Sequence, residues 1–380
     1  MDRGPFRGYC TVVLAAGKGT RLKAELSKML VMLDGQVLVA HVVRTALSLG
    51  GDEVVVVVGH QADAVKGALT AAFPGAPMRF ALQRQQRGTG DALAAGLGTI
   101  PGRKGSVVVL SGDVPLIRRS TLLRLLRTRE SRDVDLALLS MELAEPGHYG
   151  RIVREGGRVV RVVEYLDADE QTRRISEVNA GVYCIDIEFL RETLRSVGTV
   201  NVKGELYLTD LVAAASDRRG AIAIQVTPDE VRGVNTWTEQ AELERIVRRR
   251  EIARLMRNGV QVDEPETLIV ESSVRVSTGC RLGPGVTLRA GTVIGRNCRI
   301  EQGSILDGCK LGQGAWIRPY CVLDGVKVPH GADIAPYTYL VGEERGYHSE
   351  INQSRRHETG RRTRQQHQMA AGSPSRERKK

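Results

Sequence analysis

A glycine-rich segment flanked by basic residues is the part of the sequence best suited to bind phosphate. It runs from Leu14 to Leu22 and reads LAAGKGTRL, and Lys28 follows soon after. Glycine lets backbone N–H groups approach an anion closely, and a helix starting after the loop would add its positive end. Arg21 offers a fork for phosphate oxygens, and Lys28 offers a point charge. The spacing is neither that of a Walker loop nor that of a dinucleotide-binding loop, so alone it also fits a structural turn.

A second candidate is an acidic residue at the end of an apolar run. Asp113 stands in the motif SGDVPL, which directly follows the apolar residues 107–110. A side chain at the carboxyl end of a parallel strand points into the ligand crevice of an open sheet. Mg²⁺ prefers few carboxylates together with the phosphates of its substrate. One Asp at this position favours a metal–nucleotide complex, and the alternative is an Asp that only caps a turn.

The elements that must position these residues alternate between strands and helices over the first 230 residues. The strand candidates are Cys10–Ala15, Glu53–Gly59, Arg79–Gln83, Ser106–Asp113, Asp135–Met141 and Ala221–Val226, and the helix candidates include Leu38–Leu49, Asp91–Gly98 and Ser120–Arg129. Because the strand candidates are apolar throughout, we expect strands covered on both faces. The fold class is therefore α/β, with a doubly wound, mostly parallel sheet and a hairpin at residues 151–160.

A long helix is predicted after the sheet. Thr236 and Glu239 form a capping box, and apolar residues follow at helical spacing from Leu243 to Met256. Asn258-Gly259 ends this pattern, and we expect the residues up to about Leu268 to be a linker.

Beyond this linker the sequence repeats every six residues. The large aliphatic positions are Val276, Leu282, Leu288, Ile294, Ile300, Leu306, Leu311, Ile317, Leu323, Val328, Ile334 and Leu340, with two single-residue deletions. A small or β-branched residue stands two positions before each, and at four of these positions it is a cysteine: Cys280, Cys298, Cys309 and Cys321. Twelve such units predict a triangular β-helix of about four coils. We therefore expect these cysteines to be buried, free thiols in a reducing compartment.

Composition excludes a disulfide scaffold, a collagen and a mostly disordered chain. Of the 380 residues, 42% are hydrophobic and 26% are charged. The N-terminus does not read as a secretory signal and no apolar run is long enough to span a membrane, so we expect a cytoplasmic protein. The formal charge is +11, and Val341–Lys380 holds ten Arg and Lys against five Glu. We predict a solvated, disordered basic tail there and disfavour a nucleic-acid or acidic contact through Arg355, Arg356, Arg361, Arg362 and Arg364.

Eight motifs in a fixed order make the chain resemble the sugar-nucleotide pyrophosphorylases. It looks most like the bifunctional GlmU family, which joins an N-acetylglucosamine-1-phosphate uridyltransferase to a glucosamine-1-phosphate acetyltransferase. The motifs are LAAGKGTRL (14–22) with Lys28, GTG (88–90), GDVPL (112–116), YGRIVRE (149–155), VVEYLDA (162–168), EVNAG (177–181), GELYLTD (204–210) and GVN (233–235).

The resemblance implies Mg²⁺-dependent transfer of UMP from UTP to N-acetylglucosamine 1-phosphate, giving UDP-N-acetylglucosamine and pyrophosphate for peptidoglycan precursors. It assigns catalytic roles to Arg21 and Lys28. Nucleotide binding would involve Leu14, Ala15, Ala16, Gly17, Gln83, Gly88 and Thr89. Sugar binding would involve Gly150, Glu164 and Asn179, and Mg²⁺ binding Asp113 and Asn235. No protein nucleophile is needed, because the chemistry is positioning and charge neutralisation at phosphorus.

Four residues depart from the pattern usual in this family. Ser27 replaces Pro, Asp91 replaces His, Ser111 replaces an aromatic residue and Ala180 replaces Thr. These changes bear on sugar selectivity and rate more than on the reaction type, so glucose 1-phosphate is an alternative substrate. A non-catalytic scaffold subunit of the same architecture is the other alternative. The phosphate and metal ligands argue against it, because a scaffold needs neither.

We expect a nucleotidyltransferase domain at 1–235, a connecting helix and linker at 236–268, a β-helix at 269–340 and a basic tail at 341–380. The resemblance implies that the β-helix is left-handed and that the protein is a homo-oligomer, specifically a trimer. The hexapeptides stop near Leu340, before the coils that carry the acetyltransferase residues in the family. We therefore expect acetyl transfer to be absent and supplied by another protein, and His348, His357 and His367 to be non-catalytic.

Overall fold

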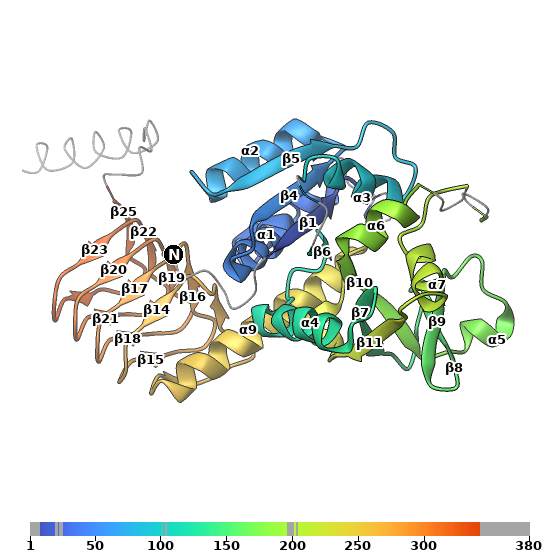
Figure 1. The fold of residues 1–380 in the computed structure, drawn as a ribbon. Helices are drawn as coiled ribbons and strands as arrows, with labels where there is room; N and C mark the ends of the chain where they lie inside the picture. The colour runs from blue at the N-terminus through green and yellow to red at the C-terminus, as the bar shows by residue number, and fades with distance from the viewer. Residues whose placement is uncertain are drawn as a thin grey trace, which may run out of the picture. The chain divides into compact units, whose positions relative to one another are not determined.

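The computed structural model describes residues 8–19, 22, 26–100, 102, 105–195, 201–202 and 204–342. The chain divides into two compact units, of which the first ends at Glu251 and the second begins at Ile252 (Figure 1). Several predicted features lie outside the described residues: Arg21, the basic tail with its arginines beyond Gly342, and His348, His357 and His367.

The first unit is built on a nine-stranded sheet in the order β5-β4-β1-β6-β10-β7-β11-β9-β8, with a small β2–β3 hairpin beside it. The strands are β1 (Tyr9–Ala15), β2 (Met32–Leu33), β3 (Gln36–Val37), β4 (Glu53–Val58), β5 (Met78–Leu82), β6 (Ser106–Ser111), β7 (Leu136–Glu142), β8 (Arg151–Glu155), β9 (Arg158–Val163), β10 (Glu177–Asp186) and β11 (Ala221–Gln225). β5, β4, β1 and β6 are parallel neighbours, and β10 runs antiparallel between β6 and β7. The predicted doubly wound, mostly parallel sheet is confirmed.

Helices cover both faces of this sheet. They are the 3₁₀ turn η2 (Lys28–Leu30), α1 (Leu38–Leu49), α2 (Ala62–Ala72), α3 (Thr89–Leu97), α4 (Arg119–Arg132), α5 (Glu170–Arg173), α6 (Ile187–Thr193), α7 (Asp210–Ser216), α8 (Pro228–Val231) and α9 (Trp237–Arg257). α1, α2 and α4 share one hydrophobic core with the sheet, and α3, α6 and α7 share the core on the other face. Burial on both faces explains why the strands are apolar throughout.

The antiparallel strand β10 is absent from the predicted strands, although it is ten residues long. Asn179 and Gly181 interrupt its apolar residues, and its pairing with β7 shifts register between Asn179 and Tyr183. A bulge of this kind breaks the continuous apolar pattern from which the other strands were predicted.

The strand order fixes where a ligand can bind. β1 has β4 on one side and β6 on the other, so the chain direction across the sheet reverses at β1. In open α/β sheets the crevice beyond the carboxyl ends of the strands at such a point is the usual ligand site. The glycine-rich loop follows β1 and Asp113 follows β6, so both candidates lie at this point.

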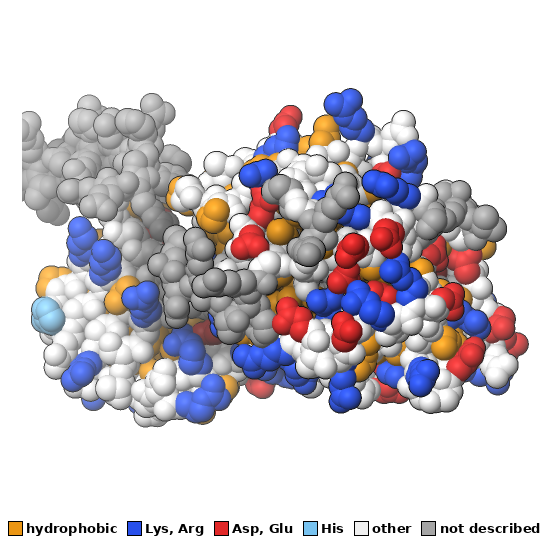
Figure 2. All heavy atoms as spheres, viewed as in Figure 1, with side chains coloured by type: hydrophobic (Ala, Val, Ile, Leu, Met, Phe, Trp, Pro, Cys, Tyr) orange, Lys and Arg blue, Asp and Glu red, His pale blue; other side chains and the backbone are white. Residues whose placement is uncertain are grey.

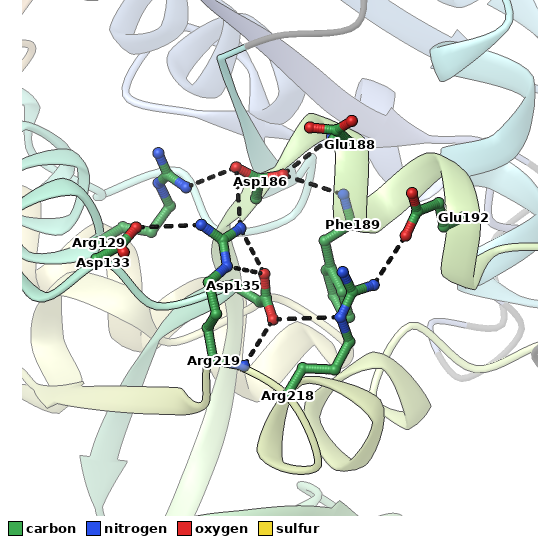
Figure 3. Close-up of polar contacts among 9 residues, drawn as sticks. All are labelled: Arg129, Asp133, Asp135, Asp186, Glu188, Phe189, Glu192, Arg218 and Arg219. Atoms are coloured by element: carbon green, nitrogen blue, oxygen red, sulfur yellow. Dashed lines mark hydrogen bonds and ion pairs between the residues drawn. The ribbon is translucent and has the colours of Figure 1, made fainter.

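A network of charged side chains lies at the amino ends of the parallel strands, at the other end from the ligand crevice (Figure 3). Asp135 is fully buried and accepts hydrogen bonds from the backbone N–H (3.0 Å) and Nε (2.7 Å) of Arg219. Asp186 pairs with Arg129 (3.1 Å) and Arg219 (3.3 Å) and also accepts from Phe189 N–H (3.0 Å) at the start of α6. These pairs neutralise two buried carboxylates and tie α4, α6 and the segment before β11 to the sheet.

Thr236 and Glu239 form the predicted capping box of α9. Oε2 of Glu239 accepts from Thr236 N–H (2.8 Å), and Glu239 N–H donates to Thr236 Oγ1 (3.2 Å). Leu243 and Val247 pack in a cluster with Leu33 and Val234, whereas the end of the helix belongs to the core of the second unit. The helix ends at Arg257, just before the predicted stop.

The second unit is a prism of three parallel sheets, with five, five and four strands. The strands are β12 (Gln261–Val262), β13 (Ile269–Val270), β14 (Arg275–Val276), β15 (Arg281–Leu282), β16 (Thr287–Arg289), β17 (Val293–Ile294), β18 (Arg299–Ile300), β19 (Ile305–Asp307), β20 (Lys310–Leu311), β21 (Trp316–Ile317), β22 (Val322–Asp324), β23 (Lys327–Val328), β24 (Asp333–Ile334) and β25 (Tyr339–Val341). Each strand pairs with the third one along the chain, so three strands make a coil. This arrangement confirms the hexapeptide-repeat fold and is consistent with a left-handed β-helix.

The prism begins earlier than the sequence suggested. β12 and β13 pair with β15 and β16, and the buried Val262 and Leu268 belong to the prism core. The predicted linker, which extends to about Leu268, therefore already contains the strand β12. The interval from Val262 to Val270 is eight residues instead of six, so a search for a strict six-residue period cannot detect β12, the first strand of this coil.

The cysteines of the prism are buried and free, as expected. Each thiol lies close to a backbone carbonyl oxygen of the prism wall. The distances are 3.0–3.1 Å for Cys280, Cys298 and Cys321, whose acceptors are Gly295 O, Gly312 O and Ala335 O, and 3.3 Å for Cys309, whose acceptor is Leu323 O. Each thiol therefore has a weak acceptor at the wall of the prism, which accounts for these residues without any chemistry.

In the described part of the chain, no helix combines the length and apolarity needed to cross a bilayer. On the face of the first unit shown in Figure 2, basic and acidic side chains are interspersed. The positive net charge therefore does not form one continuous basic patch on this face.

We expect Asp186→Asn to destabilise the first unit by about 3 kcal/mol at neutral pH, because it leaves the buried Arg129 without its carboxylate. The pKa of Asp186 lies below its ordinary value: burial opposes this shift, but the hydrogen bonds from Phe189 and Arg219 and the charge of Arg129 together outweigh it. The stabilisation should therefore be full above about pH 4, the ordinary pKa of Asp, and disappear as the pH falls through the lower folded-state pKa. Urea unfolding of both proteins across this range measures the difference.

Asp133→Asn is the matched control. Asp133 also pairs with Arg219, but its side chain is 84% exposed, so we expect less than about 0.5 kcal/mol of change. Equal effects of the two variants, or a penalty for Asp186→Asn that does not shrink in acid, would contradict this account of the network.

Candidate active site

A cavity of about 340 Å³ lies at the carboxyl ends of β1 and β6. It brings together residues from separate motifs of the sequence. Of the predicted site residues, its lining contains Leu14, Ala16, Gly17, Lys28, Gln83, Gly88, Thr89 and Asp113. Ala15 is not among them, because its side chain is fully buried in the core beneath the loop.

The glycine-rich loop folds tightly over Lys28. Gly19 has φ +63°, and a Cβ there would lie 2.6 Å from the Cβ of Lys28, so any side chain would clash. Ala16 O accepts hydrogen bonds from Gln86 Nε2 (2.9 Å) and His60 N–H (3.3 Å). These contacts fix the described part of the loop from outside and leave Gly17 on the wall of the cavity.

Lys28, Asp113 and Asn235 meet at the floor of the cavity. Lys28 Nζ lies 2.5 Å from Asp113 Oδ2 and 3.2 Å from Asn235 Oδ1. Their positions are fixed by the backbone, because Val234 N–H donates to Asp113 O (3.1 Å) and Asn235 N–H donates to Glu239 Oε2 (2.6 Å) in the α9 capping box. The two oxygens expected to bind a metal therefore converge on one cationic atom.

Ser27 supports Lys28 from below. It is fully buried, its N–H donates to Gln61 Oε1 (2.7 Å), and its Oγ accepts from Met29 N–H (3.4 Å) at the start of η2. Proline, the residue usual in the family at this position, has no N–H to donate. The Ser27–Gln61 hydrogen bond thus anchors the turn that carries Lys28 through an N–H group that proline would lack.

The GTG and GELYLTD motifs interlock at the other end of the cavity. Gly90 N–H donates to Leu206 O (2.8 Å), and Leu206 N–H donates to Arg87 O (2.7 Å). Gly88 has φ +109°, and a Cβ there would lie 2.5 Å from Leu206 O, so this position requires glycine. Thr89 Oγ1 accepts from Leu208 N–H (3.0 Å), which places its hydroxyl in the packing between the two motifs.

Gln83 lies between this loop and the cavity, and only 6% of its surface is exposed. Its Nε2 donates to Gly88 O (3.1 Å) and to Asp91 Oδ2 (2.9 Å). The carboxylate of Asp91 in turn pairs with Arg87 (2.8 Å). Both hydrogens of the Gln83 amide are thus engaged within the protein.

The three predicted sugar-binding residues also lie close together. Asn179 N–H donates to Gly150 O (2.9 Å), and a Cβ on Gly150 would lie 3.5 Å from Glu164 Oε1. Glu164 lines a second cavity, of about 230 Å³, where it accepts a hydrogen bond from Thr209 Oγ1 (3.1 Å). The side chain of Asn179 points back into β10, with Nδ2 on Tyr183 Oη (2.6 Å).

The charged side chains differ between the two cavities: the first has Lys28 with Asp113 and Glu205, whereas three carboxylates and Arg161 line the second. Asp167, Tyr207 and Asp210 line it together with Glu164. Burial raises the pKa of Asp210, with a further contribution from the charge of Asp167, and burial raises the pKa of Tyr207 to about 12. Carboxylates and hydroxyls of this kind suit a ligand rich in hydroxyl groups and repel a phosphate.

Sequence reasoning missed several residues of these cavities. Tyr207 and Thr209 lie within a motif that was identified, but no side chain in it was given a role. Ser111 was noted only as a departure from the family, yet it lines the first cavity and donates to Gly181 O (3.1 Å). Glu205 belongs to the same motif as Tyr207 and Thr209, and Gln86 had no signal beyond its polarity.

The first unit thus has one cavity lined by the glycine-rich loop, Lys28 and Asp113, and a second cavity lined by carboxylates and hydroxyls. A profile of MobA-like NTP transferase domains matches residues 11–182. This range contains part of the lining of both cavities. The chain is similar to proteins named bifunctional protein GlmU. It is 44% identical to that of Anaeromyxobacter sp. (strain Fw109-5) over 310 residues, 81% of this chain and 63% of the relative.

Two further relatives bear the same name. Identity is 41% over 310 residues with that of Anaeromyxobacter dehalogenans (strain 2CP-C), covering 81% of this chain and 64% of the relative. It is 37% over 318 residues with that of Geotalea uraniireducens (strain Rf4), covering 82% of this chain and 68% of the relative. The chain thus spans less than two thirds of the length of the Anaeromyxobacter relatives it matches.

Proposed function

This chain belongs to the GlmU family, and we propose that it transfers UMP from UTP to N-acetylglucosamine 1-phosphate. The products would be UDP-N-acetylglucosamine, a precursor for the cell envelope, and pyrophosphate. The observation that carries this proposal is the meeting of Lys28 with Asp113 and Asn235 beside the glycine-rich loop. Because the reaction consumes UTP, we expect it to take place in the cytoplasm.

The residues at the floor of the first cavity fit a divalent cation. Asp113 Oδ2 and Asn235 Oδ1 are hard oxygen donors that already converge on the positive charge of Lys28. Only one of them is charged, which suits Mg²⁺, an ion that keeps several positions for water and substrate phosphates. When bound, the ion would neutralise negative charge that develops on the phosphate oxygens.

The chain's own residues position the two substrates. In the proposed reaction, an oxygen of the sugar 1-phosphate bonds to the α-phosphorus of UTP, and the bond from that phosphorus to the pyrophosphate oxygen breaks in line. Lys28 would turn from Asp113 to the triphosphate, which is within reach of a flexible side chain. The N–H groups of the glycine-rich loop would bind phosphate oxygens, and no protein nucleophile takes part. Arg21 is proposed as a second triphosphate ligand from the family resemblance.

The second cavity would hold the sugar. Glu164 and Thr209 are already hydrogen-bonded to each other and can exchange this contact for hydroxyl groups of the ligand. The backbone at Gly150 leaves no room for a side chain, since a Cβ would lie 2.9 Å from Val162 Cγ1. These features support a hexose phosphate, and the N-acetyl group is taken from the family resemblance.

Release of pyrophosphate tests the reaction. With UTP, Mg²⁺ and N-acetylglucosamine 1-phosphate we expect turnover, and with glucose 1-phosphate a lower kcat/KM. Asp113→Ala should reduce kcat by at least about 100-fold, the loss typical of a group that stabilises charge in the transition state. Asp63→Ala, at a fully exposed carboxylate of α2, is the matched control and should leave kcat unchanged. A wild-type protein that releases no pyrophosphate, or an Asp113→Ala variant with full activity, would overturn the proposal.

The cation centre also predicts competition between Lys28 and a divalent cation. The ammonium lies against both oxygens that the ion would use, so removing it should free them. We expect Lys28→Gln to bind Mn²⁺ about tenfold more tightly than the wild type in the absence of nucleotide, a gain of about 1.4 kcal/mol. Electron paramagnetic resonance of free Mn²⁺ measures this binding directly. Asp113→Asn should weaken it, and Lys66→Gln, an exposed lysine of α2, should not change it. Unchanged or weaker binding to Lys28→Gln would refute the competition.

We also propose a homotrimer assembled through the prism. One outward position on each strand of the β13-β16-β19-β22-β25 sheet is uncharged: Ile269, Thr287, Ile305, Val322 and Tyr339. On β16, β19 and β22 a second outward position is charged: Arg289, Asp307 and Asp324. The outward positions on the other two sheets are mostly charged, among them Arg275, Arg281, Arg299, Lys310, Lys327 and Asp333. The uncharged column supports self-association through the face that carries it.

Ile305→Glu places a charge at the centre of this face, and 38% of Ile305 is exposed in the single chain. We expect it to convert a trimer into monomers in light scattering, because burying an unpaired carboxylate in the interface is unfavourable. Lys310→Glu, on a different face, is the control and should remain trimeric. A monomeric wild type, or a trimeric Ile305→Glu, would contradict the assembly.

A further inference from the structure

The amide of Gln83 has only one orientation compatible with its neighbours. Its nitrogen lies 3.1 Å from Gly88 O and 2.9 Å from Asp91 Oδ2. A backbone carbonyl and a carboxylate both accept hydrogen bonds and donate none. If the amide were turned over, its Oε1 would face two other oxygens. The chemistry of the neighbours therefore fixes which end of the amide is which.

Asp91 is held in place from its other side. Its Oδ1 accepts from Arg87 Nη2 (2.8 Å) and Nε (3.3 Å), which leaves Oδ2 for Gln83. The side chain of Asp91 is 16% exposed, whereas that of Arg87 is 68% exposed. Asp91 also lies in the first turn of α3, where the helix dipole favours a negative charge. The carboxylate is thus a fixed acceptor beside the cavity.

With both hydrogens of Nε2 engaged, Oε1 is the atom that the Gln83 amide can offer to a ligand in the cavity. We propose that Asp91 is a positioning residue for base selection, which holds Gln83 so that it presents an acceptor to the base. Uracil carries a hydrogen on ring nitrogen N3 and can donate to this oxygen. Cytosine carries a lone pair on N3, which would face the lone pairs of Oε1. This inference rests on the proposed function, in which Gln83 contacts the base of the nucleotide.

The Asp91→Asn variant tests the orientation through Arg87. Because a guanidinium only donates, Arg87 would bind the Oδ1 of the new Asn and turn its Nδ2 toward Gln83. Gln83 could then turn Oε1 toward that Nδ2 in exchange for its hydrogen bond to Gly88 O, and this orientation presents its NH₂ group to the base. The preference between N3–H and an N3 lone pair should therefore weaken or reverse.

The experiment is an internal competition between UTP and CTP for one pool of enzyme, with N-acetylglucosamine 1-phosphate and Mg²⁺. The ratio of the two UDP- and CDP-sugar products gives the ratio of the kcat/KM values. This ratio does not depend on the fraction of active protein, so partial misfolding of a variant leaves it interpretable. We expect the wild type to favour UTP and Asp91→Asn to lower the ratio about tenfold, the scale of one hydrogen bond.

Asp91→Ala should have a smaller effect, because Gly88 O still holds one hydrogen of the amide. Asp91→Glu keeps the carboxylate and should restore part of the selectivity. Asp63→Asn makes the same change of group on the exposed side of α2 and should leave the ratio unchanged. A ratio for Asp91→Asn equal to that of the wild type overturns the role of Asp91. A wild type that forms neither product overturns the proposed function itself, so the two failures are distinct.

Discussion

The ion pair between Lys28 and Asp113 is the contact on which the arrangement of the site depends. It joins the 3₁₀ turn after the glycine-rich loop to the segment after β6, and Asn235 adds the start of α9. These side chains are largely buried, with 11% and 18% exposed for the two partners, so neither charge is stable there without the other. The same pair of opposite charges makes the cavity floor ready for a cation and places an ammonium group where phosphate would arrive. Structure and proposed chemistry thus have one physical origin.

The two cavities of the first unit offer different groups to a ligand. The glycine-rich loop lines the first together with Lys28, Asp113 and Glu205, while Glu164, Asp167 and Asp210 line the second. Backbone hydrogen bonds between the GTG and GELYLTD motifs link the elements that line the two cavities. The oppositely charged side chains around Asp135 and Asp186 neutralise one another at the amino ends of the parallel strands, away from the cavities. This network therefore stabilises the fold and adds little to the electrostatic potential in the site.

The sequence allowed prediction of features that follow a regular period or a continuous pattern. Strands buried on both faces are apolar throughout, and a strict six-residue repeat defines most of the prism, so both folds were predictable. β10 was missed because the bulge at Asn179 breaks its pattern, and the first strand of the prism, β12, because two additional residues precede Val270. In the site, the loop, Lys28 and Asp113 were predictable from their chemistry. The pairing of Thr209 with Glu164 depends on packing between distant motifs, which no spacing in the sequence reveals.

Three of the four residues that depart from the family pattern, Ser27, Asp91 and Ser111, are not simple losses, because each forms a hydrogen bond within the protein. Ser27 uses an N–H that proline lacks, and Ser111 uses its hydroxyl to donate to Gly181 O. Asp91 accepts from Gln83 and Arg87 at once, which a single imidazole nitrogen cannot do. All three act on backbone or side chains next to the first cavity and none removes a proposed ligand of the triphosphate. The departures therefore change how the nucleotide site is supported, and the groups that would carry out the transfer stay in place.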